Sequence, residues 1–362
     1  MVIGVLKESA DARVAIVPDS ITKSKLEGVE YIFEKGLGVN ASITDDQFQD
    51  YGKLTGRDEV LKNADLVICI NPIASDEMKQ MKKGAAIISM FQPYNDESVK
   101  AALDKLDINA FSMDMIPRTT LAQSMDVLSS MASIAGYKSV LTAADHLPRY
   151  FPMMITAAGS IRPAKVVVLG AGVAGLQAIA TAKRLGAMVE ASDVRSAAKE
   201  EILSLGAKFI EVEGAAEDTG AGGYAVEQSE EFLQRQREHV QERATQADVI
   251  ITTAQVRGRK APMLLPKSTV EKMRTGSVVV DLASSTGGNC EVSEDDKVIS
   301  HHGVTIIGNS NLADTMPQHA SLLYSNNVLN FLKYAVKEGA INYDMEDEII
   351  GGSCISRFET AS

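Results

Sequence analysis

Short apolar runs alternate with longer helical stretches along the whole chain. In the second half such runs fall at residues 164–169, 208–212, 248–254, 277–283 and 304–307, and another run closes on Asp193. Each run has the length of a buried strand, and the stretches between them have the apolar spacing of helices. The pattern predicts an α/β fold, with six strands of this half in a doubly wound, mostly parallel sheet.

The first third repeats part of this series. Residues 64–68 are similar to 247–251, and 81–88 are similar to 273–280. Any two α/β domains can share such runs, but the order of strand, helix and glycine-led strand is the same in both. We expect two Rossmann-like domains with a cleft between them, one formed by residues 1–130 plus 320–362 and the other by 136–315. Helices are expected at 124–137 and 326–337, and a short hairpin within 340–357.

One segment carries a dinucleotide-binding pattern. Gly170, Gly172 and Gly175 follow an apolar run in G-x-G-x-x-G spacing, and a helical stretch without proline comes next. The first glycine permits a tight turn, the second lets the backbone approach a pyrophosphate, and the third lets helix and strand pack closely. A helix N-terminus also attracts phosphate through its free N–H groups and its dipole.

The acidic residue after the second strand bears on which nucleotide binds. A carboxylate at Asp193 would accept hydrogen bonds from ribose hydroxyls and repel a 2′-phosphate, which favours NAD(H) over NADP(H). Arg195, two residues on, would weaken that preference if it reached a phosphate. We interpret Arg195 instead as a solvated side chain or a stacking partner for adenine.

Bulk properties narrow the class of protein. The 362 residues carry a net charge of −12, which argues against nucleic acid and anionic membrane surfaces as direct partners. Three scattered cysteines without metal-site spacing predict a reducing compartment and no metal site. The start resembles a first strand rather than a signal peptide, and no apolar run approaches the ~20 residues of a membrane helix.

A second polar cluster lies at residues 115–130. If Gln123 opens a helix, Asp126 and Ser129 follow at three-residue steps on one face, with Arg118 in the loop before them. Such a surface suits a nicotinamide carboxamide, which needs both donors and acceptors. Helix capping by Asp126 explains the same spacing equally well.

Long motifs here resemble the NAD(H)-binding component of proton-translocating nicotinamide nucleotide transhydrogenases, a family whose superfamily also holds alanine dehydrogenases. The motifs are 117–118, 123–126, 128–130, 151–159, 170–187, 222–225, 283 and 287–290. The resemblance covers nearly the whole chain. It implies a homodimer that works with an NADP(H)-binding component and a membrane-spanning component, in the cytoplasm at the inner face of the cell membrane.

The resemblance also assigns residues. It implies that Arg118, Gln123 and Asp126 surround the nicotinamide with Ser129 near the carboxamide, and that Tyr224 belongs to a loop that closes over the nucleotide. The glycine- and alanine-rich composition of 213–223 fits a flap of this kind. The residues expected to contact NAD(H) are Gly170, Ala171, Gly172, Val173, Gly175, Asp193, Val194, Arg195, Tyr224 and Ala254.

Two other functions stay open at this point. An alanine dehydrogenase must protonate a carbonyl oxygen, yet segments 66–72 and 88–93, where that family places its acid and base, contain neither His nor Lys. Lys7 and Arg13 would remain to bind an anionic substrate. A non-catalytic NAD-binding module is the third possibility. Hydride transfer between two nicotinamides needs alignment but no general acid, and this sequence fits it best.

Overall fold

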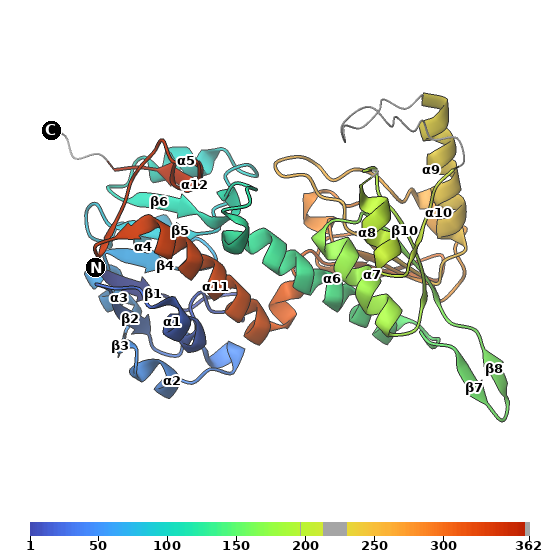
Figure 1. Ribbon diagram of the computed structural model, residues 1–362, viewed down its shortest axis with the longest axis horizontal. Helices are drawn as coiled ribbons and strands as arrows, with labels where there is room; N and C mark the ends of the chain where they lie inside the picture. Colours follow the sequence, from blue (N-terminus) through green and yellow to red (C-terminus); the bar gives the residue numbers. More distant parts are fainter. Residues whose placement is uncertain (196, 213–229, 359–362) are drawn as a thin grey trace. The chain divides into compact units, whose positions relative to one another are not determined.

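The computed structural model of this chain describes residues 1–195, 197–212 and 230–358. The chain divides into two compact units (Figure 1). The first unit comprises Met1–Met131 and Ala313–Ser362, and the second unit comprises Ala132–Leu312. Tyr224 and the predicted flap at 213–223 lie outside the described residues. Among the described residues, no helix is long and apolar enough to cross a bilayer.

The first unit is built on a seven-stranded sheet. Its strands are β1 (Val2–Val5), β2 (Glu30–Glu34), β3 (Gly52–Thr55), β4 (Leu66–Ile68), β5 (Ala86–Ser89), β6 (Asn109–Ser112) and β18 (Cys354–Ser356). The spatial order is β18-β6-β5-β4-β1-β2-β3, and β18 alone of these runs antiparallel to its neighbour. The helices are α1 (Pro18–Ser24), α2 (Asp46–Gln49), α3 (Arg57–Asn63), α4 (Ser75–Met78), α5 (Ser98–Leu103), α11 (Pro317–Ala335) and α12 (Glu348–Ser353).

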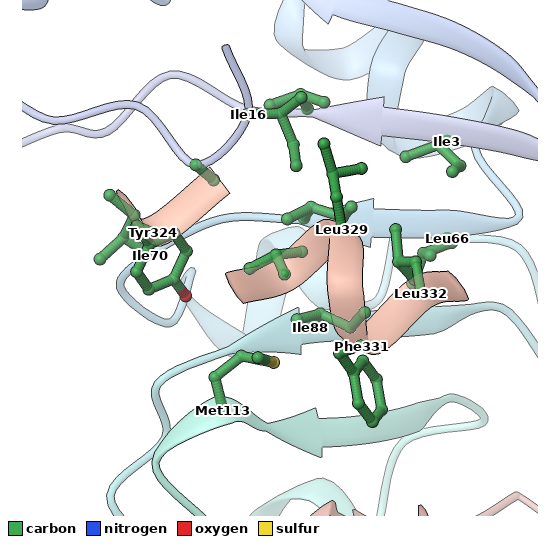
Figure 2. Close-up of a cluster of buried hydrophobic side chains, with 14 of the residues drawn as sticks. Ile3, Ile16, Leu66, Ile70, Ile88, Met113, Tyr324, Leu329, Phe331 and Leu332 are labelled. Atoms are coloured by element: carbon green, nitrogen blue, oxygen red, sulfur yellow. The ribbon is translucent and has the colours of Figure 1, made fainter. Parts of the chain in front are cut away.

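Both faces of this sheet are buried. Ile88 of β5 belongs to the hydrophobic cluster around α11, and its neighbour Ile87 belongs to the cluster on the opposite face. Because successive side chains of a strand point to opposite faces, this alternation means that helices cover both sides. Figure 2 shows Leu329, Phe331 and Leu332 of α11 packed over the strands from the α11 side. Helix α11, although it comes late in the chain, therefore completes the core of the first unit.

The second unit contains another seven-stranded sheet. Its strands are β9 (Lys165–Leu169), β10 (Met188–Ser192), β11 (Lys208–Phe209), β12 (Val249–Thr252), β13 (Val278–Asp281), β14 (Lys297–His301) and β15 (Val304–Gly308). The order is β11-β10-β9-β12-β13-β15-β14, with β14 antiparallel to β15. The helices are α7 (Val173–Arg184), α8 (Ala198–Ser204), α9 (Glu230–Thr245) and α10 (Lys267–Val270). A separate hairpin pairs β7 (Met154–Thr156) with β8 (Gly159–Ile161), and α6 (Val127–His146) crosses the division between the units.

The two sheets share one topology. In each, the first parallel strand is central, the next two lie on one side, the following three lie on the other, and an antiparallel strand closes the edge. This confirms the predicted α/β class with two Rossmann-like, doubly wound sheets. The repeated segments occupy equivalent places, since β4 and β12 are both fourth in the series and β5 and β13 both fifth.

One strand was missed, and several local predictions differ from the structure. The helix predicted at 326–337 is α11, which begins at Pro317 and ends at Ala335. Strand β14 was not expected, and α6 begins at Val127 rather than at residue 124 because Gln123–Met125 forms a separate 3-10 turn. The hairpin predicted within 340–357 is wrong for most of its length. At its start, β17 (Ala340–Ile341) pairs with β16 (Val336–Lys337), which precedes the predicted range. Helix α12 then intervenes because the Asp347 carboxylate accepts hydrogen bonds from two backbone N–H groups of its first turn.

Candidate nucleotide site and the polar loop of the first unit

The glycine loop of the second unit lies at the carboxyl end of its central strand. Strand β9 has β10 on one side and β12 on the other, so the chain leaves it in both directions. Such a switch point is where open α/β sheets bind ligands. The segments that follow these three strands carry Gly170, Asp193 and Thr253.

The three glycines differ in what surrounds them. Gly170 adopts φ +99°, a conformation that favours glycine. A Cβ atom at Gly175 would lie 1.9 Å from the carbonyl oxygen of Gly170, so only glycine permits this helix to pack so closely. A Cβ at Gly172 would meet nothing within 4 Å, so the backbone there faces open space at the start of α7. The first N–H groups of α7 have no partner within the helix and face a region that an anion can enter.

Asp193 links the strand tip to this loop. Its Oδ2 accepts a hydrogen bond of 2.6 Å from the backbone N–H of Ala171, and its side chain is only 8 % exposed. Burial alone would raise the pKa of Asp193, but hydrogen bonds from the Arg195 side chain and the Ala171 amide outweigh it and lower that pKa. The carboxylate is therefore ionised and already positioned at the glycine loop.

Arg195 forms an ion pair with Asp193, with 3.0 Å between Nε and Oδ1, and its Nη2 also donates to the carbonyl of Ala171. The Arg195 side chain is 55 % exposed, as expected of a solvated side chain, but its pairing with Asp193 was not predicted, and stacking on adenine stays a prediction. The pair forms because the backbone turns back after Asp193, and Oδ1 also accepts the backbone N–H of Arg195. Val194 between them is 97 % exposed.

Residues that follow β12 and β13 form hydrogen bonds beside the glycine loop. The Asn289 side chain donates to the carbonyl of Ala254 and accepts from its N–H, at 2.9 and 3.0 Å. Thr253 Oγ1 donates to the carbonyl of Gly170 at 3.1 Å. We did not predict a role for Thr253 or Asn289 from the sequence, although Thr253 follows a predicted strand and Asn289 lies inside the 287–290 motif.

The 287–290 motif is organised by a buried carboxylate. Asp281, at the end of β13, is fully buried and accepts five hydrogen bonds from Thr252 Oγ1, Ser293 Oγ and the N–H groups of Ala283, Asn289 and Cys290. These bonds replace water around the charge. Asp281 therefore fixes the loop that presents Asn289 to Ala254.

The predicted polar cluster at residues 115–130 contains one pair of bonded side chains and two exposed side chains. Asp126 caps α6, since its Oδ1 accepts from the Ser129 N–H at 2.9 Å and its Oδ2 from Ser129 Oγ at 2.6 Å. Arg118 and Gln123 are exposed, and within the described residues their side chains have no hydrogen bond or ion pair. The four side chains therefore do not line one helix face. Asp126 and Ser129 cap the start of α6, and Arg118 and Gln123 are exposed in the segment before it.

Helix α11 positions the turn that carries Gln123. Its Asn327 and Asn330 side chains both donate to the carbonyl of Ser124, at 2.8 and 3.2 Å, while Met125 is buried beneath the turn. Gln123 thus projects from a fixed backbone although its side chain has no partner of its own among the described residues.

Arg13 does not offer a free cation for a substrate. Its guanidinium binds the Asp11 carboxylate and lies 3.0 Å from Asp314 Oδ1, and its side chain is 7 % exposed. Burial would lower the pKa of Arg13, but Asp11 and Asp314 raise it above its ordinary value. Asp11 and Asp314 therefore already pair with the positive charge of Arg13 that an anionic substrate would need.

Comparison with known proteins identifies the family. The N-terminal domain of the alanine dehydrogenase/PNT family matches residues 4–135, and the C-terminal domain of the same family matches 139–359. This chain belongs to the alanine dehydrogenase/PNT family. The two matched domains account for both sheets described above.

Within the alanine dehydrogenase/PNT family, the chain is similar over nearly its whole length to transhydrogenase subunits. It is 44% identical to the first part of NAD(P) transhydrogenase subunit alpha of Rhodospirillum rubrum, over 97% of this chain and 94% of that protein. NAD(P) transhydrogenase subunit alpha of Haemophilus influenzae is 40% identical, over 99% of this chain and 71% of that protein. A crystal structure of transhydrogenase from Sinorhizobium meliloti superposes with a TM-score of 0.90 at 39% identity, covering 99% of each chain.

Alanine dehydrogenases of the same family are more distant. That of Mycolicibacterium smegmatis is 26% identical over 93% of this chain and 88% of that protein. The sequence-based resemblance to transhydrogenase components is therefore confirmed, and membership of the family implies nucleotide binding.

Proposed function

We propose that this chain is the NAD(H)-binding component of a proton-translocating NAD(P) transhydrogenase. NADH would supply a hydride directly to NADP⁺ on a partner component. The observation that carries the proposal is the glycine loop at the switch point of the second unit, where open space at Gly172 adjoins an ionised Asp193. The 40–44% identity to named transhydrogenase subunits supports it.

The second unit would bind the adenosine and pyrophosphate. The pyrophosphate would rest against Gly172 and the first turn of α7, next to Val173, and Asp193 would accept hydrogen bonds from the ribose. Arg195 is 55 % exposed, so its side chain is free to swing outward when the ribose arrives. Val194 and Ala254 would supply apolar and backbone contacts. The charge of Asp193 favours NAD(H) over NADP(H).

The first unit would orient the nicotinamide. Gln123 and Arg118 are exposed and available to a ligand, while the Asp126–Ser129 pair fixes the start of α6 beside them. Direct hydride transfer moves no proton, so these residues need only set the position and tilt of the ring. We assign Gln123 to ring positioning and Arg118, Asp126 and Ser129 to holding the ring and the loop.

The same residues argue against an alanine dehydrogenase activity. Reduction of a 2-oxo acid requires a cation for its carboxylate and an acid for its carbonyl oxygen. Arg13 is bound to Asp11 and Asp314, which leaves the exposed Lys7 as a cation for the carboxylate. Segments 66–72 and 88–93 contain neither His nor Lys to act as the acid. The described site thus supports nicotinamide-to-nicotinamide transfer over carbonyl reduction.

We further propose that the chain forms a homodimer through the β7–β8 hairpin. This hairpin extends away from the seven-stranded sheet of the second unit (Figure 1), and Met153, Ile155 and Ile161 are 59, 77 and 40 % exposed. An isolated two-stranded hairpin is marginally stable in water, so a second copy would stabilise it by covering these side chains. Ile155→Asp should convert a dimer to a monomer in sedimentation velocity. An unchanged sedimentation coefficient would place the interface elsewhere.

The proton pathway and membrane attachment would belong to partner subunits, with this chain peripheral at the inner face of the membrane. The test of the whole proposal is reconstitution. The chain alone should bind NADH yet fail to oxidise it with pyruvate and ammonium. Addition of an NADP(H)-binding component should create transhydrogenation. Turnover with pyruvate and ammonium by the chain alone would replace this proposal with a dehydrogenase.

A further inference from the structure

Two histidines and a glutamate converge on the surface of the second unit. His301 ends β14, His302 follows in the turn to β15, and Glu271 follows α10 thirty residues earlier. One ligand atom from each lies within 4.8 Å of the others. We propose that these three side chains form a binding site for a divalent transition metal of the zinc class.

The distances suit such an ion. Nε2 of His301 and Nε2 of His302 lie 3.2 and 3.6 Å from Oε1 of Glu271. Metal–ligand bonds of about 2.0–2.1 Å in a tetrahedron separate neighbouring ligand atoms by about 3.3 Å. Two imidazoles and one carboxylate are a frequent zinc ligand set, and water would take the fourth position.

The turn explains how two adjacent histidines can bind the same metal ion. Consecutive side chains of a regular strand point to opposite faces. His302 and Gly303 have φ of +50° and +76°, as in the two-residue turns that join tight hairpins. This conformation brings the His302 ring to the same side as His301, with 4.8 Å between the ring centroids.

An ion pair alone accounts poorly for this arrangement. The side chains of His301, His302 and Glu271 are 24, 59 and 33 % exposed, and exposed ion pairs stabilise proteins little. Two protonated imidazoles would also repel each other. A metal would instead join the end of α10 to the outer hairpin of the sheet. Lys267 Nζ lies 3.9 Å from Glu271 Oε1 and would compete weakly with it.

This site would be separate from nucleotide binding. The His302–Gly303 turn precedes β15 and so lies at the amino edge of the parallel strands, whereas the glycine loop lies at their carboxyl edge. Metal should therefore stabilise the second unit without changing NADH affinity.

The test is calorimetric titration of the full chain with zinc chloride at pH 7.5. The variants are Glu271→Gln, His301→Gln and His302→Asn, and His302→Asn retains a residue that favours this turn. His239→Asn is the matched control, because His239 pairs with Glu242 at 3.6 Å and no third ligand joins them within the part of the chain that the structure describes. Thermal unfolding without metal checks that each variant folds.

We expect one zinc ion per chain, at least tenfold weaker binding in each of the three variants, and no change in the control. Zinc should raise the unfolding temperature of the wild type and leave NADH affinity unchanged. Absence of zinc binding, or equal binding in wild type and all three variants, would overturn the proposal.

Discussion

The two units share one strand order, but their switch points are built differently. In the second, β9 leads into Gly170, and Thr253 after β12 donates to its carbonyl. In the first, β1 leads toward Glu8, whose carboxylate accepts hydrogen bonds from the N–H groups of Ile70 and Asn71, after β4, at 2.6 and 3.2 Å. Glu8 is only 6 % exposed.

The difference shows how one topology gives two roles. In the first unit the Glu8 carboxylate binds the backbone N–H groups that a phosphate would need as hydrogen-bond donors. Burial raises the pKa of Glu8 despite those hydrogen bonds. The second leaves the backbone at Gly172 open. Strand order places a potential site, and the residues of one loop decide whether a ligand or the protein itself fills it.

The largest effect on stability and NADH binding should come from changing Gly175, where α7 packs against the glycine loop of the second unit. Gly175→Ala places a Cβ 1.9 Å from the Gly170 oxygen, so α7 must shift. We expect about 3 kcal/mol of destabilisation and loss of measurable NADH binding. Urea unfolding and calorimetry measure the two effects.

Gly172→Ala is the matched control, because its Cβ meets nothing within 4 Å. It should retain stability within about 0.5 kcal/mol and still weaken NADH binding. Equal stability of the Gly175→Ala protein and the wild type would show that close packing does not explain the third glycine.

The first unit should control rate rather than affinity. Gln123→Asn shortens the side chain by one methylene and keeps its amide. A misplacement of about 1 Å costs on the order of a hundredfold in rate. We expect that loss in stopped-flow transfer with the partner component, with an NADH dissociation constant changed by less than about tenfold.

Ser124→Ala controls for the Gln123 change, because the Ser124 backbone carbonyl that α11 holds remains in place. A normal transfer rate with weakened NADH binding in Gln123→Asn would make this residue a binding group only.

The Asp193–Arg195 pair should control which nucleotide the second unit prefers. Asp193→Asn removes a charged acceptor and should narrow the preference for NADH over NADPH by about 1–3 kcal/mol. Arg195→Ala leaves the carboxylate without its neutralising partner and should widen the preference. Calorimetry with both nucleotides tests the pair, and a narrowed preference in Arg195→Ala would assign phosphate contact to Arg195.

The smallest effect concerns Asp314, a partly buried carboxylate of the first unit. Burial raises the pKa of Asp314 to about 6, although Arg13 lies 3.0 Å away. The folded protein then binds this proton more tightly than the unfolded chain, so stability should fall as pH rises from about 4 to about 6.

Asp314→Asn should remove that step and gain about 1 kcal/mol over wild type at pH 7.5, after allowance for partial exposure. Urea unfolding between pH 5 and 7.5 measures it, and Asp50→Asn, at an exposed carboxylate, should change nothing. A parallel pH dependence in Asp314→Asn and wild type would contradict the assignment.

Sequence patterns predicted most of the fold because both sheets are buried on two faces. Continuous apolar runs such as that of β9 therefore stand out, and glycine spacing locates the nucleotide loop. The antiparallel β14 was missed because its side chains are mostly exposed and lack such a run. The C-terminal stretch was misread because the Asp347 cap competes with strand alternation.

Side-chain partnerships were harder to predict. The Arg195–Asp193 pair depends on how the backbone turns after β10, and Glu8 meets Ile70 across 62 positions of sequence. Spacing could not separate the capping and ligand roles of Asp126. The structure assigns the cap, and the nicotinamide role of the loop stays a prediction.

The most direct measurement follows hydride transfer from NADH to an NADP⁺ analogue after this chain is mixed with an NADP(H)-binding transhydrogenase component. We predict rapid transfer that requires both proteins and that becomes about a hundredfold slower with Gln123→Asn, while the chain alone leaves pyruvate and ammonium unreacted. Transfer at the same rate without this chain, or NADH oxidation by this chain alone with pyruvate and ammonium, would contradict this prediction.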